Sequence, residues 1–303
     1  MTATLATPIP TVRRIPFRFP DEIDPLWNRG HHEWSHMING VSMTMPYLEP
    51  YLIATLREGA KQIDDPDVLV EIKAFCAQEG QHYRAHRRYN ELLKQHYPVL
   101  AELEEQMAAG WKKLATERSL AYRLAYSAGF ESMTLGVTKW LVEDRRKLFG
   151  GSNSQVASFA LWHMVEEVEH KRVAYDAYQA AVGNDWHRAF GVLSGSLHVF
   201  WWSRACCIAM LKADGKWRDP RSRLKLWRRT GEFFAAVIPF ALRAMKPGHD
   251  PRDEPDPEWV TEWLSGFEAV ASDPAVEDLV LLDTNHPDIP VPFARPAVTG
   301  AVQ

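Results

Sequence analysis

The chain has 303 residues, which is enough for one large domain or two smaller ones with a sizeable core. Its formal net charge of −4 gives no general reason to expect a nucleic acid as partner. Its three cysteines are too few and too poorly spaced for a disulfide framework, and its N-terminal segment lacks the apolar stretch of a secretory signal. Together these features predict a protein of the reducing cytoplasm.

Apolar residues recur with helical spacing along most of the chain, and strand signals are nearly absent, so the sequence predicts an all-α fold. Residues 1–25 contain five prolines and are expected to form an irregular arm. The helices expected after this arm cover residues 33–60, 67–95, 101–111, 119–149 and 154–182.

Proline positions give the sharpest local predictions within these helices. The run DDP at residues 64–66 predicts a helix start, because an acidic side chain can cap the first turn and proline fits there. Pro46 and Pro50 lie inside the first helix, where proline removes a backbone hydrogen bond. A kink is therefore expected beside Glu49.

The most informative pattern is a pair of Glu-x-x-His motifs, each preceded by a lone glutamate in an apolar helical stretch. The lone glutamates precede the motifs by 30 and 36 residues, about the length of one helix, a connection and part of a second helix. Residues three apart share a helix face, so the Glu and His of each motif can point at one ion. Two such hairpins would centre four carboxylates and two imidazoles in a four-helix bundle, as in ferritin-like dimetal-carboxylate proteins. The six predicted ligands are Glu49, Glu79 and His82 in the first set and Glu131, Glu167 and His170 in the second.

Two further histidines continue these stripes. His86 lies four residues after His82, and His163 lies four residues before Glu167, so each faces the same way as its motif. Both are predicted as additional metal ligands. The alternative for each is a core histidine bonded to a backbone carbonyl, or a histidine that orients a ligand.

Other glutamates close to the motifs are expected to behave differently. A buried carboxylate is costly unless it is paired or bound to a cation, and no basic residue shares the helix face of Glu49. Glu166 and Glu169 lie about 100° round the helix from the predicted ligands. They are expected to accept hydrogen bonds from Lys171, Arg172 or solvent.

A competing motif occurs at the start of the first helix. Residues 32–36 read HEWSH, which matches the zincin pattern H-E-x-x-H. The third ligand that a catalytic zinc needs is not evident, and the sequence does not predict the sheet against which zincins place this helix. The cluster from His31 to His36 is therefore expected at the mouth of the helix or in a supporting role.

From Pro16 to Tyr178 the chain resembles the ferritin-like proteins described as predicted metal-dependent hydrolases. The stretches that carry the resemblance are PFRFPDEIDPLWN, MPYLEPY, QEGQHYRAH, GFESMT and WHMVEEVEHKRVAYD, and the later KPGHDPRDEP and VTEWL fit the same family. The resemblance implies a non-haem diiron site, with members acting as oxygen-dependent monooxygenases. It places the ligand roles on the six residues above, with His86 and His163 as additional histidines. One departure is LEP at residues 48–50, where a Gly-Glu pair is expected.

Carboxylate and imidazole ligands suit two iron ions, or manganese, and the lack of thiolates disfavours a structural zinc site. The sequence therefore predicts a diiron monooxygenase that uses O2 as co-substrate to oxidise a hydrophobic small molecule. No flavin or ferredoxin pattern is present, so an external electron donor or reductase is expected as a partner. The alternative is a dinuclear metal-dependent hydrolase, because two metals can also clamp a hydrolytic displacement. Storage or sensing is a third reading, and the oligomeric state stays open, with a homodimer among the candidates.

The C-terminal third raises a separate question. Residues 190–211 are apolar but contain His198 and Arg204, which argues against a simple membrane span. A basic stretch at 218–229 precedes apolar residues 233–242, and such helices can lie on an anionic membrane surface. The preferred interpretation packs both helices on the bundle, over a hydrophobic substrate channel. The predicted units are the arm over 1–25, a metal-binding bundle over 26–183, packed helices over 184–272 and an irregular tail over 273–303.

Overall fold

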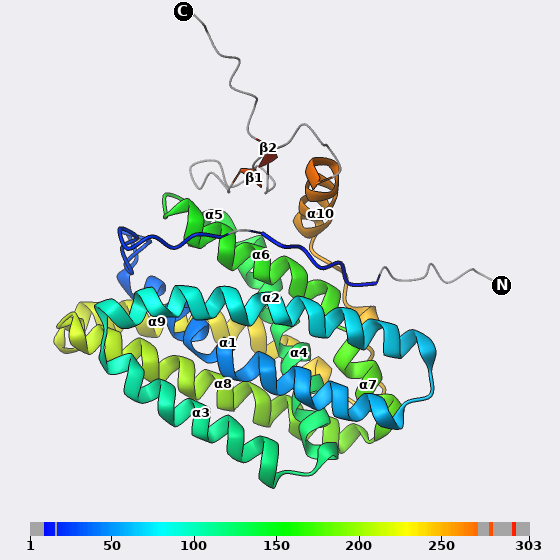
Figure 1. Ribbon diagram of the computed structural model, residues 1–303. Coiled ribbons are helices and arrows are strands. Elements are labelled where there is room, and N and C mark those ends of the chain that lie inside the picture. Colours follow the sequence, from blue (N-terminus) through cyan, green and yellow to red (C-terminus); the bar gives the residue numbers. More distant parts are fainter. Residues whose placement is uncertain (1–8, 16, 272–278, 281–292, 295–303) are drawn as a thin grey trace, which may run out of the picture.

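The structure, a computed structural model, describes residues 9–15, 17–271, 279–280 and 293–294 (Figure 1). The predicted irregular tail lies almost entirely outside these residues. In chain order the α-helices are α1 His32–Gly59, α2 Pro66–His96, α3 Val99–Glu117, α4 Leu120–Glu143, α5 Arg145–Phe149, α6 Ser154–His170, α7 Val173–Ala181, α8 Asp185–Ala213, α9 Pro220–Ala244 and α10 Glu258–Ala271. Short 3-10 turns cover Ala60–Gln62, Lys216–Arg218 and Pro251–Asp253, and β1 Leu279–Val280 pairs antiparallel with β2 Phe293–Ala294. The predicted all-α class is confirmed for the described core.

Helix starts follow the local sequence closely. The carboxylate of Asp65 accepts hydrogen bonds from the backbone N–H groups of Asp67 and Val68, and Pro66 occupies the first turn of α2. This confirms the start predicted at residues 64–66. Pro46 and Pro50 both lie inside α1, which runs without interruption from His32 to Gly59.

Two of the predicted long helices are wrong, because each is divided into two helices in the structure. The helix expected over 119–149 is divided into α4 and α5 at Asp144, and the one expected over 154–182 is divided into α6 and α7 after His170. Asp144 belongs to both ends of the first break, since its N–H bonds to the carbonyl of Trp140 and its own carbonyl accepts from the N–H of Leu148. Such a short interruption leaves the apolar period nearly intact, and the sequence pattern carries no signal for it. The third predicted helix, over 101–111, is longer than expected, because α3 covers Val99–Glu117.

The helices pack around α1 and α4. α1 packs against α2 and α8, and α4 packs against α6, α7, α8 and α9 (Figure 1). Close approach of α4 and α8 depends on glycine: a Cβ added at Gly129 would lie 2.1 Å from the backbone nitrogen of Val192, and one added at Gly191 would lie 1.9 Å from the carbonyl oxygen of Ala125. Because backbones meet at these points, α8 lies in direct backbone contact with α4, the helix that carries Glu131.

The described arm residues, 9–15 and 17–31, form no helix or strand and run across α2 and α6 (Figure 1). The ring of Phe17 contacts those of Phe159 and Trp162 on α6, and Phe19 contacts Tyr89 on α2. These aromatic contacts bury apolar surface and fix the arm against α2 and α6. Among the described residues, no helix is both long enough and apolar enough to cross a membrane.

Candidate metal centre

Four helices bring the eight predicted ligands together in the middle of the molecule, and all eight side chains are buried. The helical period explains this convergence, because residues three or four apart on α2 and on α6 share one face. The contributors are Glu49 from α1; Glu79, His82 and His86 from α2; Glu131 from α4; and His163, Glu167 and His170 from α6.

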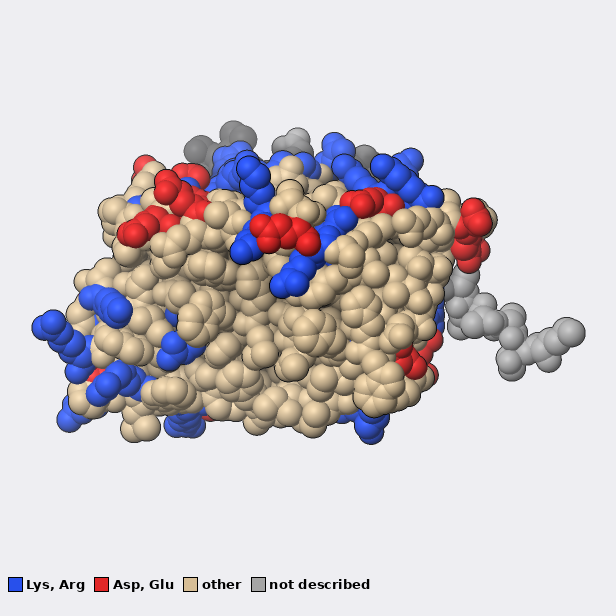
Figure 2. All heavy atoms as spheres, turned by 90° about the horizontal axis from the view of Figure 1, so that it is seen from below, with Lys and Arg blue, Asp and Glu red and all other residues tan. Residues whose placement is uncertain are grey.

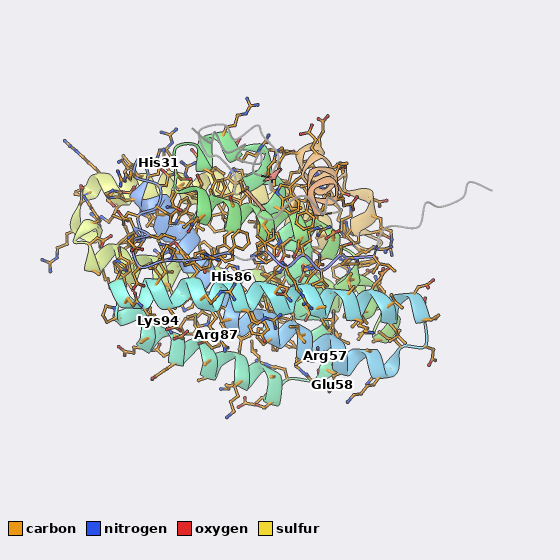
Figure 3. The ribbon with its side chains drawn as sticks, turned by 45° about the horizontal axis from the view of Figure 1, so that its top comes forward. His31, Arg57, Glu58, His86, Arg87 and Lys94 are labelled. Carbon is orange, nitrogen blue, oxygen red and sulfur yellow. The ribbon has the colours of Figure 1, made fainter. Side chains whose placement is uncertain are left out.

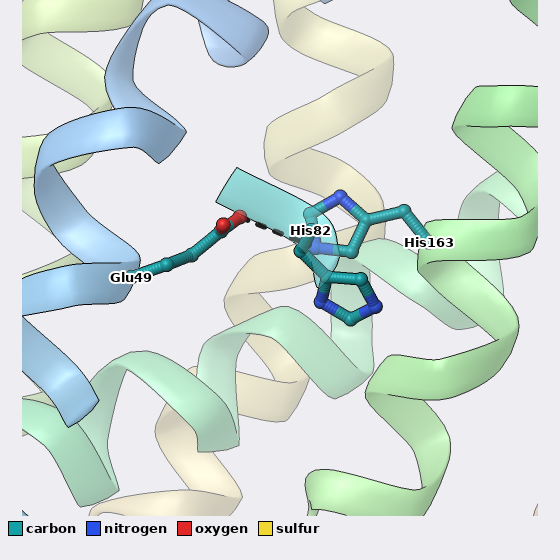
Figure 4. A group of neighbouring side chains, drawn as sticks. All are labelled: Glu49, His82 and His163. Carbon is teal, nitrogen blue, oxygen red and sulfur yellow. Dashed lines mark ion pairs between the residues drawn. The ribbon is translucent and has the colours of Figure 1, made fainter. Parts of the chain in front are cut away.

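The first group of donors consists of Glu49, His82 and His163, whose ligand atoms all lie within 4.8 Å of one another. Figure 4 shows the Glu49 carboxylate pointing from α1 toward the two imidazoles, with Nε2 of His163 3.7 Å from its Oε1 atom. Three different helices therefore converge on one point. Such a group is the right size to hold a single metal ion.

The second group consists of Glu79, Glu167 and His170, again within 4.8 Å. Nδ1 of His170 lies 3.2 Å from Oε1 of Glu79 and 3.7 Å from Oε1 of Glu167. The same Glu167 oxygen lies 2.8 Å from Nε2 of His163, which belongs to the first group. The two groups are thus adjacent, and Glu167 lies between them.

The grouping differs from the one that the sequence pattern indicates. The sequence places the two motifs in separate hairpins, but each group in the structure combines α2 with α6. His82 of the first motif joins His163, while Glu79 of that motif joins the second group. Interleaving of this kind is expected where two motif-bearing helices lie face to face.

Glu131 lies outside both groups of three but close to the second. Burial raises the pKa of Glu131 well above its usual range, and the neighbouring Glu167 carboxylate raises it further. Neither carboxylate oxygen of Glu131 has a hydrogen-bond partner among the described residues. A buried and unbonded carboxyl group facing another carboxylate is an arrangement that a bound cation would stabilise.

His86, which extends from α2 (Figure 3), supports His163 rather than joining either group. The hydroxyl of Ser42 donates to Oδ1 of Asn90, so its oxygen accepts from Nδ1–H of His86. Nε2 of His86 then accepts the Nδ1–H of His163, at 2.8 Å. This chain of bonds fixes the ring of His163 with its Nε2 atom pointing at Glu167, at 2.8 Å. This geometry fits the alternative given above for His86, namely a histidine that orients a metal ligand without binding the metal.

The four carboxylates divide into two electrostatic classes. Burial, followed by the neighbouring carboxylates, raises the pKa of Glu49 well above its usual range. Burial also acts to raise the pKa of Glu167, but the charge of His170 and the bond from His163 outweigh it and hold the pKa well below the usual range. Four acidic groups share one dry core, and cations would relieve the repulsion between them.

Many donor atoms of the predicted ligands point inward without a partner in the described part of the chain. They are both carboxylate oxygens of Glu49 and Glu131, one oxygen each of Glu79 and Glu167, and Nδ1 of His82 and of His170. Unbonded buried polar atoms are rare in proteins, so this concentration in one place requires an explanation. Two metal ions fit it, and oxygen and imidazole donors without thiolates suit iron, manganese or zinc. That each of the eight side chains binds metal stays a prediction.

The expectation for Glu166 and Glu169 is wrong. Glu166 is fully buried and accepts the Nε2–H of His82 at 2.8 Å, and its other oxygen bonds to the guanidinium of Arg13 at 3.1 Å. Glu169 pairs with the same guanidinium at 2.6 Å. The cations named by the sequence bind elsewhere: Lys171 pairs with Asp256 and Arg172 with Glu71. Both cations sit where the chain turns from α6 into α7, which directs them away from the α6 glutamates.

A glutamine was also missed. Gln78 precedes Glu79 on α2, and its Oε1 atom accepts the Nε2–H of His170 at 2.8 Å. No local pattern marks Gln78 or Arg13 as part of the site, because their partners lie far away in sequence. Arg13 and Glu166 are separated by 153 residues.

The zincin-like motif does not form a second metal site among the described residues. His36 is buried, and its Nε2 atom lies 2.7 Å from the carboxylate of Asp214. His31, near the start of α1, lies far from His86 in Figure 3. The supporting role expected for this cluster therefore takes the form of a hydrogen bond between His36 of α1 and Asp214 at the end of α8.

The family model for predicted metal-dependent hydrolases matches residues 11–255. Comparisons with curated proteins and with solved structures gave no match. The matched region includes the arm from residue 11, every helix that carries a predicted ligand, and both α8 and α9. The chain belongs to the predicted metal-dependent hydrolase family.

Proposed function

We propose that this family member is a dinuclear metalloenzyme with a ferritin-like four-helix bundle around its site. The observation that carries the proposal is the pair of adjacent donor groups that meet at Glu167. Glu49, His82 and His163 would hold one ion, and Glu79, Glu167 and His170 the other. Glu131 would complete the carboxylate set beside the second ion.

When bound, two ions in such a site supply Lewis acidity toward water and a substrate oxygen and, if they are iron, electrons for O2. The chain's own residues do the rest. His86 and Glu166 fix which nitrogen of His163 and of His82 faces the site. The surrounding aromatic side chains of the arm and α6 keep bulk water away from the carboxylates.

Metal-dependent hydrolysis is the activity that the family membership favours. Two ions about 3.5–4 Å apart can hold both the attacking and the leaving oxygen of a displacement. Glu167 belongs to the second group and lies 2.8 Å from His163 of the first, so its carboxylate would be available to an ion in either group. The expected substrates are hydrophobic esters, amides or phosphate esters.

An O2-activating monooxygenase is the second candidate, and the donor set favours it. Four carboxylates and up to four imidazoles without a thiolate suit iron or manganese, and the buried position protects reactive species from water. This reading requires O2 as co-substrate, a hydrophobic small-molecule substrate and an external electron donor.

One experiment tests both. The protein is loaded without oxygen with Fe²⁺, Mn²⁺ or Zn²⁺, freed of excess metal, and the metal is counted per chain. Each form is then assayed for cleavage of p-nitrophenyl esters and phosphates and, separately, for O2 consumption with a chemical reductant. About two ions per chain with cleavage by the Zn²⁺ or Mn²⁺ form supports hydrolysis; O2 uptake by the Fe²⁺ form alone supports the oxygenase. Fewer than one ion per chain in all three forms contradicts the dinuclear site.

A further inference from the structure

One face of the molecule is apolar where a protein facing only water would carry charges. Between Trp186 and Leu211, the exposed side chains of α8 are all large and apolar. They are Trp186 at 77%, Phe190 at 54%, Leu193 at 48%, Leu197 at 54% and Trp201 at 68% exposure. The opposite side of the helix packs on α1 and α4. Figure 2 shows a broad face of the molecule with few charged side chains over its centre.

The spacing of these side chains indicates what covers them. They follow one another by four, three, four and four residues, which is the spacing of a seam between two packed helices. The stripe is about 22 Å long at the rise of an α-helix. Serine and alanine lie along its sides, as at Ala189 and Ser194, and the one half-exposed arginine of α8, Arg204, comes only after its last tryptophan. A helix that lies on a membrane carries cations beside its apolar stripe, as the start of α9 does, but the middle of the α8 stripe carries none.

The area is also large enough for a stable pair. Four exposed apolar side chains on α9 add to the apolar surface of α8: Leu224, Trp227, Ile238 and Leu242. The rings of Trp186, Phe190, Trp201 and Trp227 alone expose on the order of 500 Å², given 150–250 Å² for a whole aromatic side chain. A standard interface buries roughly 800 Å² per partner.

We propose that a second copy of this chain covers the stripe, with the two α8 helices antiparallel about a two-fold axis near Leu193 and Ser194. Charge selects the direction. Exposed cations gather where α9 begins, close to the end of α8: Arg221, Arg223, Lys225 and Arg228. An antiparallel pair places the two basic ends at opposite ends of the interface, whereas a parallel pair would bring them together.

The test measures mass in solution by light scattering after size exclusion. The expected mass of the wild-type protein is twice 34.6 kDa. The double variant Leu193→Glu/Leu197→Glu is expected to be a monomer, and the control Val70→Glu/Val99→Glu, which changes two exposed valines on α2 and α3, is expected to stay a dimer. A monomeric wild-type protein at 50 μM, or a dimer that survives the α8 variant, overturns the proposal. A monomer that sediments with phosphatidylserine vesicles shows that a lipid surface covers the stripe instead.

Cross-linking tests the direction of the pair. In an antiparallel dimer Leu193→Cys faces its own copy and forms a disulfide on mild oxidation, but Trp186→Cys does not, because its partner position is near Trp201. The three native cysteines are buried and give the background. Cross-linking of both variants indicates a parallel pair and contradicts the two-fold arrangement.

A different observation carries a second inference, which rests on the proposed metal centre. The arm is bonded to both motif histidines through two side chains. Arg13, only 2% exposed, binds Glu166, which accepts the Nε2–H of His82. Gln78 donates to the carbonyl of Thr11 at 2.8 Å and accepts the Nε2–H of His170.

Both links act on the same atoms of the two imidazoles. Because Nε2 of each ring is engaged as a donor, Nδ1 of His82 and of His170 is the atom left to face the carboxylates. Glu169 joins the two links, since it bonds to Arg13 and to Nε2 of Gln78. A bonded group behind a histidine fixes its tautomer and ring orientation.

We infer that Arg13 is a positioning residue of the metal centre, acting through Glu166 on His82. Arg13→Ala is expected to weaken metal binding about 10- to 100-fold in a chelator competition. Arg13→Lys, which keeps a cation but loses the fork that reaches both glutamates, is expected to recover part of the affinity. Arg14→Ala removes the exposed neighbour and is the matched control.

A readout without metal separates this inference from the proposed function. In the metal-free wild-type protein the Nε2–H protons of His82 and His170 are expected as slowly exchanging signals in ¹⁵N-resolved NMR. Arg13→Ala is expected to lose the His82 signal while leaving the circular dichroism spectrum unchanged, and Gln78→Met the His170 signal. Retention of the His82 signal and of wild-type metal affinity in Arg13→Ala overturns the inference. Absence of metal binding in the wild type would instead contradict the metal centre, with the NMR result still deciding the role of the arm.

Discussion

The metal centre and the α8 surface both depart from the usual distribution of side chains, in which charged groups are exposed and large apolar groups are buried. The centre buries four carboxylates and four imidazoles inside the bundle, while α8 exposes tryptophan, phenylalanine and leucine along its outer side. Buried charges and exposed apolar stripes are both costly for an isolated chain. Each departure therefore points to something that the chain binds: cations at the centre and an apolar partner at the surface.

Contact between the two regions provides the most sensitive test. Gly129 on α4 lies against the backbone of α8, so Gly129→Ala forces apart the helix that carries Glu131 and the helix that carries the stripe. We expect a loss of more than about 4 kcal/mol in the free energy of unfolding, measured by urea denaturation. Gly231→Ala in α9 meets no atom within 4 Å and is expected to gain about 0.5–1 kcal/mol. Equal effects of the two substitutions would mean that α8 does not pack on α4 as described.

A pair of leucines compares the inside of the bundle with the α8 surface directly. Leu52 in α1 is completely buried, and Leu197 in α8 is 54% exposed. Leu52→Ala is expected to cost about 2–5 kcal/mol of monomer stability through the cavity that it leaves. Leu197→Ala, measured in dilute protein where any dimer has dissociated, is expected to cost less than about 1 kcal/mol. A large cost at Leu197 would show that the monomer already buries the stripe.

The shared glutamate tests whether the two donor groups form one centre. Glu167→Ala removes the carboxylate between them, so both ions should be lost, with affinity reduced at least ~100-fold. Metal content per chain after desalting measures this, and Glu143→Ala on the exposed side of α4 is the control. Loss of only one ion would show that the groups are independent, and full metal content would refute the ligand assignment.

The metal-free centre should lose stability as pH rises. The pKa of Glu49 is raised in the folded protein by burial and then by its carboxylate neighbours, while the unfolded group titrates near 4.5. Its contribution is complete below pH 4.5 and is lost as pH rises toward the folded pKa, because ionisation favours the unfolded chain. Glu49→Gln in the metal-free protein should therefore flatten the fall in stability above pH 4.5. An unchanged pH profile would show that Glu49 ionises freely in the fold.

The stability that depends on His198 in α8 should change with pH in the opposite direction, falling as pH drops. Burial lowers the pKa of His198 from 6.5 to about 4, so the folded protein holds this imidazole neutral. Stability is complete above pH 6.5 and falls as pH drops toward 4, because the unfolded chain takes up the proton first. The loss is expected to be about 1–2 kcal/mol after allowance for partial exposure. His198→Gln should remove this slope in urea unfolding between pH 6.5 and 4, and an identical slope in the variant would contradict it.

Local chemistry made part of the structure predictable from the sequence. The helical period identified the helices, and DDP at residues 64–66 marked the start of α2, because caps and prolines act on their own turn. The Glu-x-x-His spacing brought Glu79 with His82, and Glu167 with His170, onto single helix faces, since residues three apart always share a face. These features depend only on residues that are close together in the chain, so they can be predicted from the sequence.

Tertiary packing decided the rest. Three features join segments that no local pattern relates. They are the grouping of the motif residues into two donor groups, the pairing of Arg13 with Glu166 across 153 residues, and the backbone contact of α4 with α8. Periodicity assigned Glu166 to the outside of its helix, but the arm covers that side and turns it into an interior one. The sequence therefore determined the ligand types and their helical spacing, and the structure determined their grouping and support, because burial depends on what the remainder of the chain places against each face.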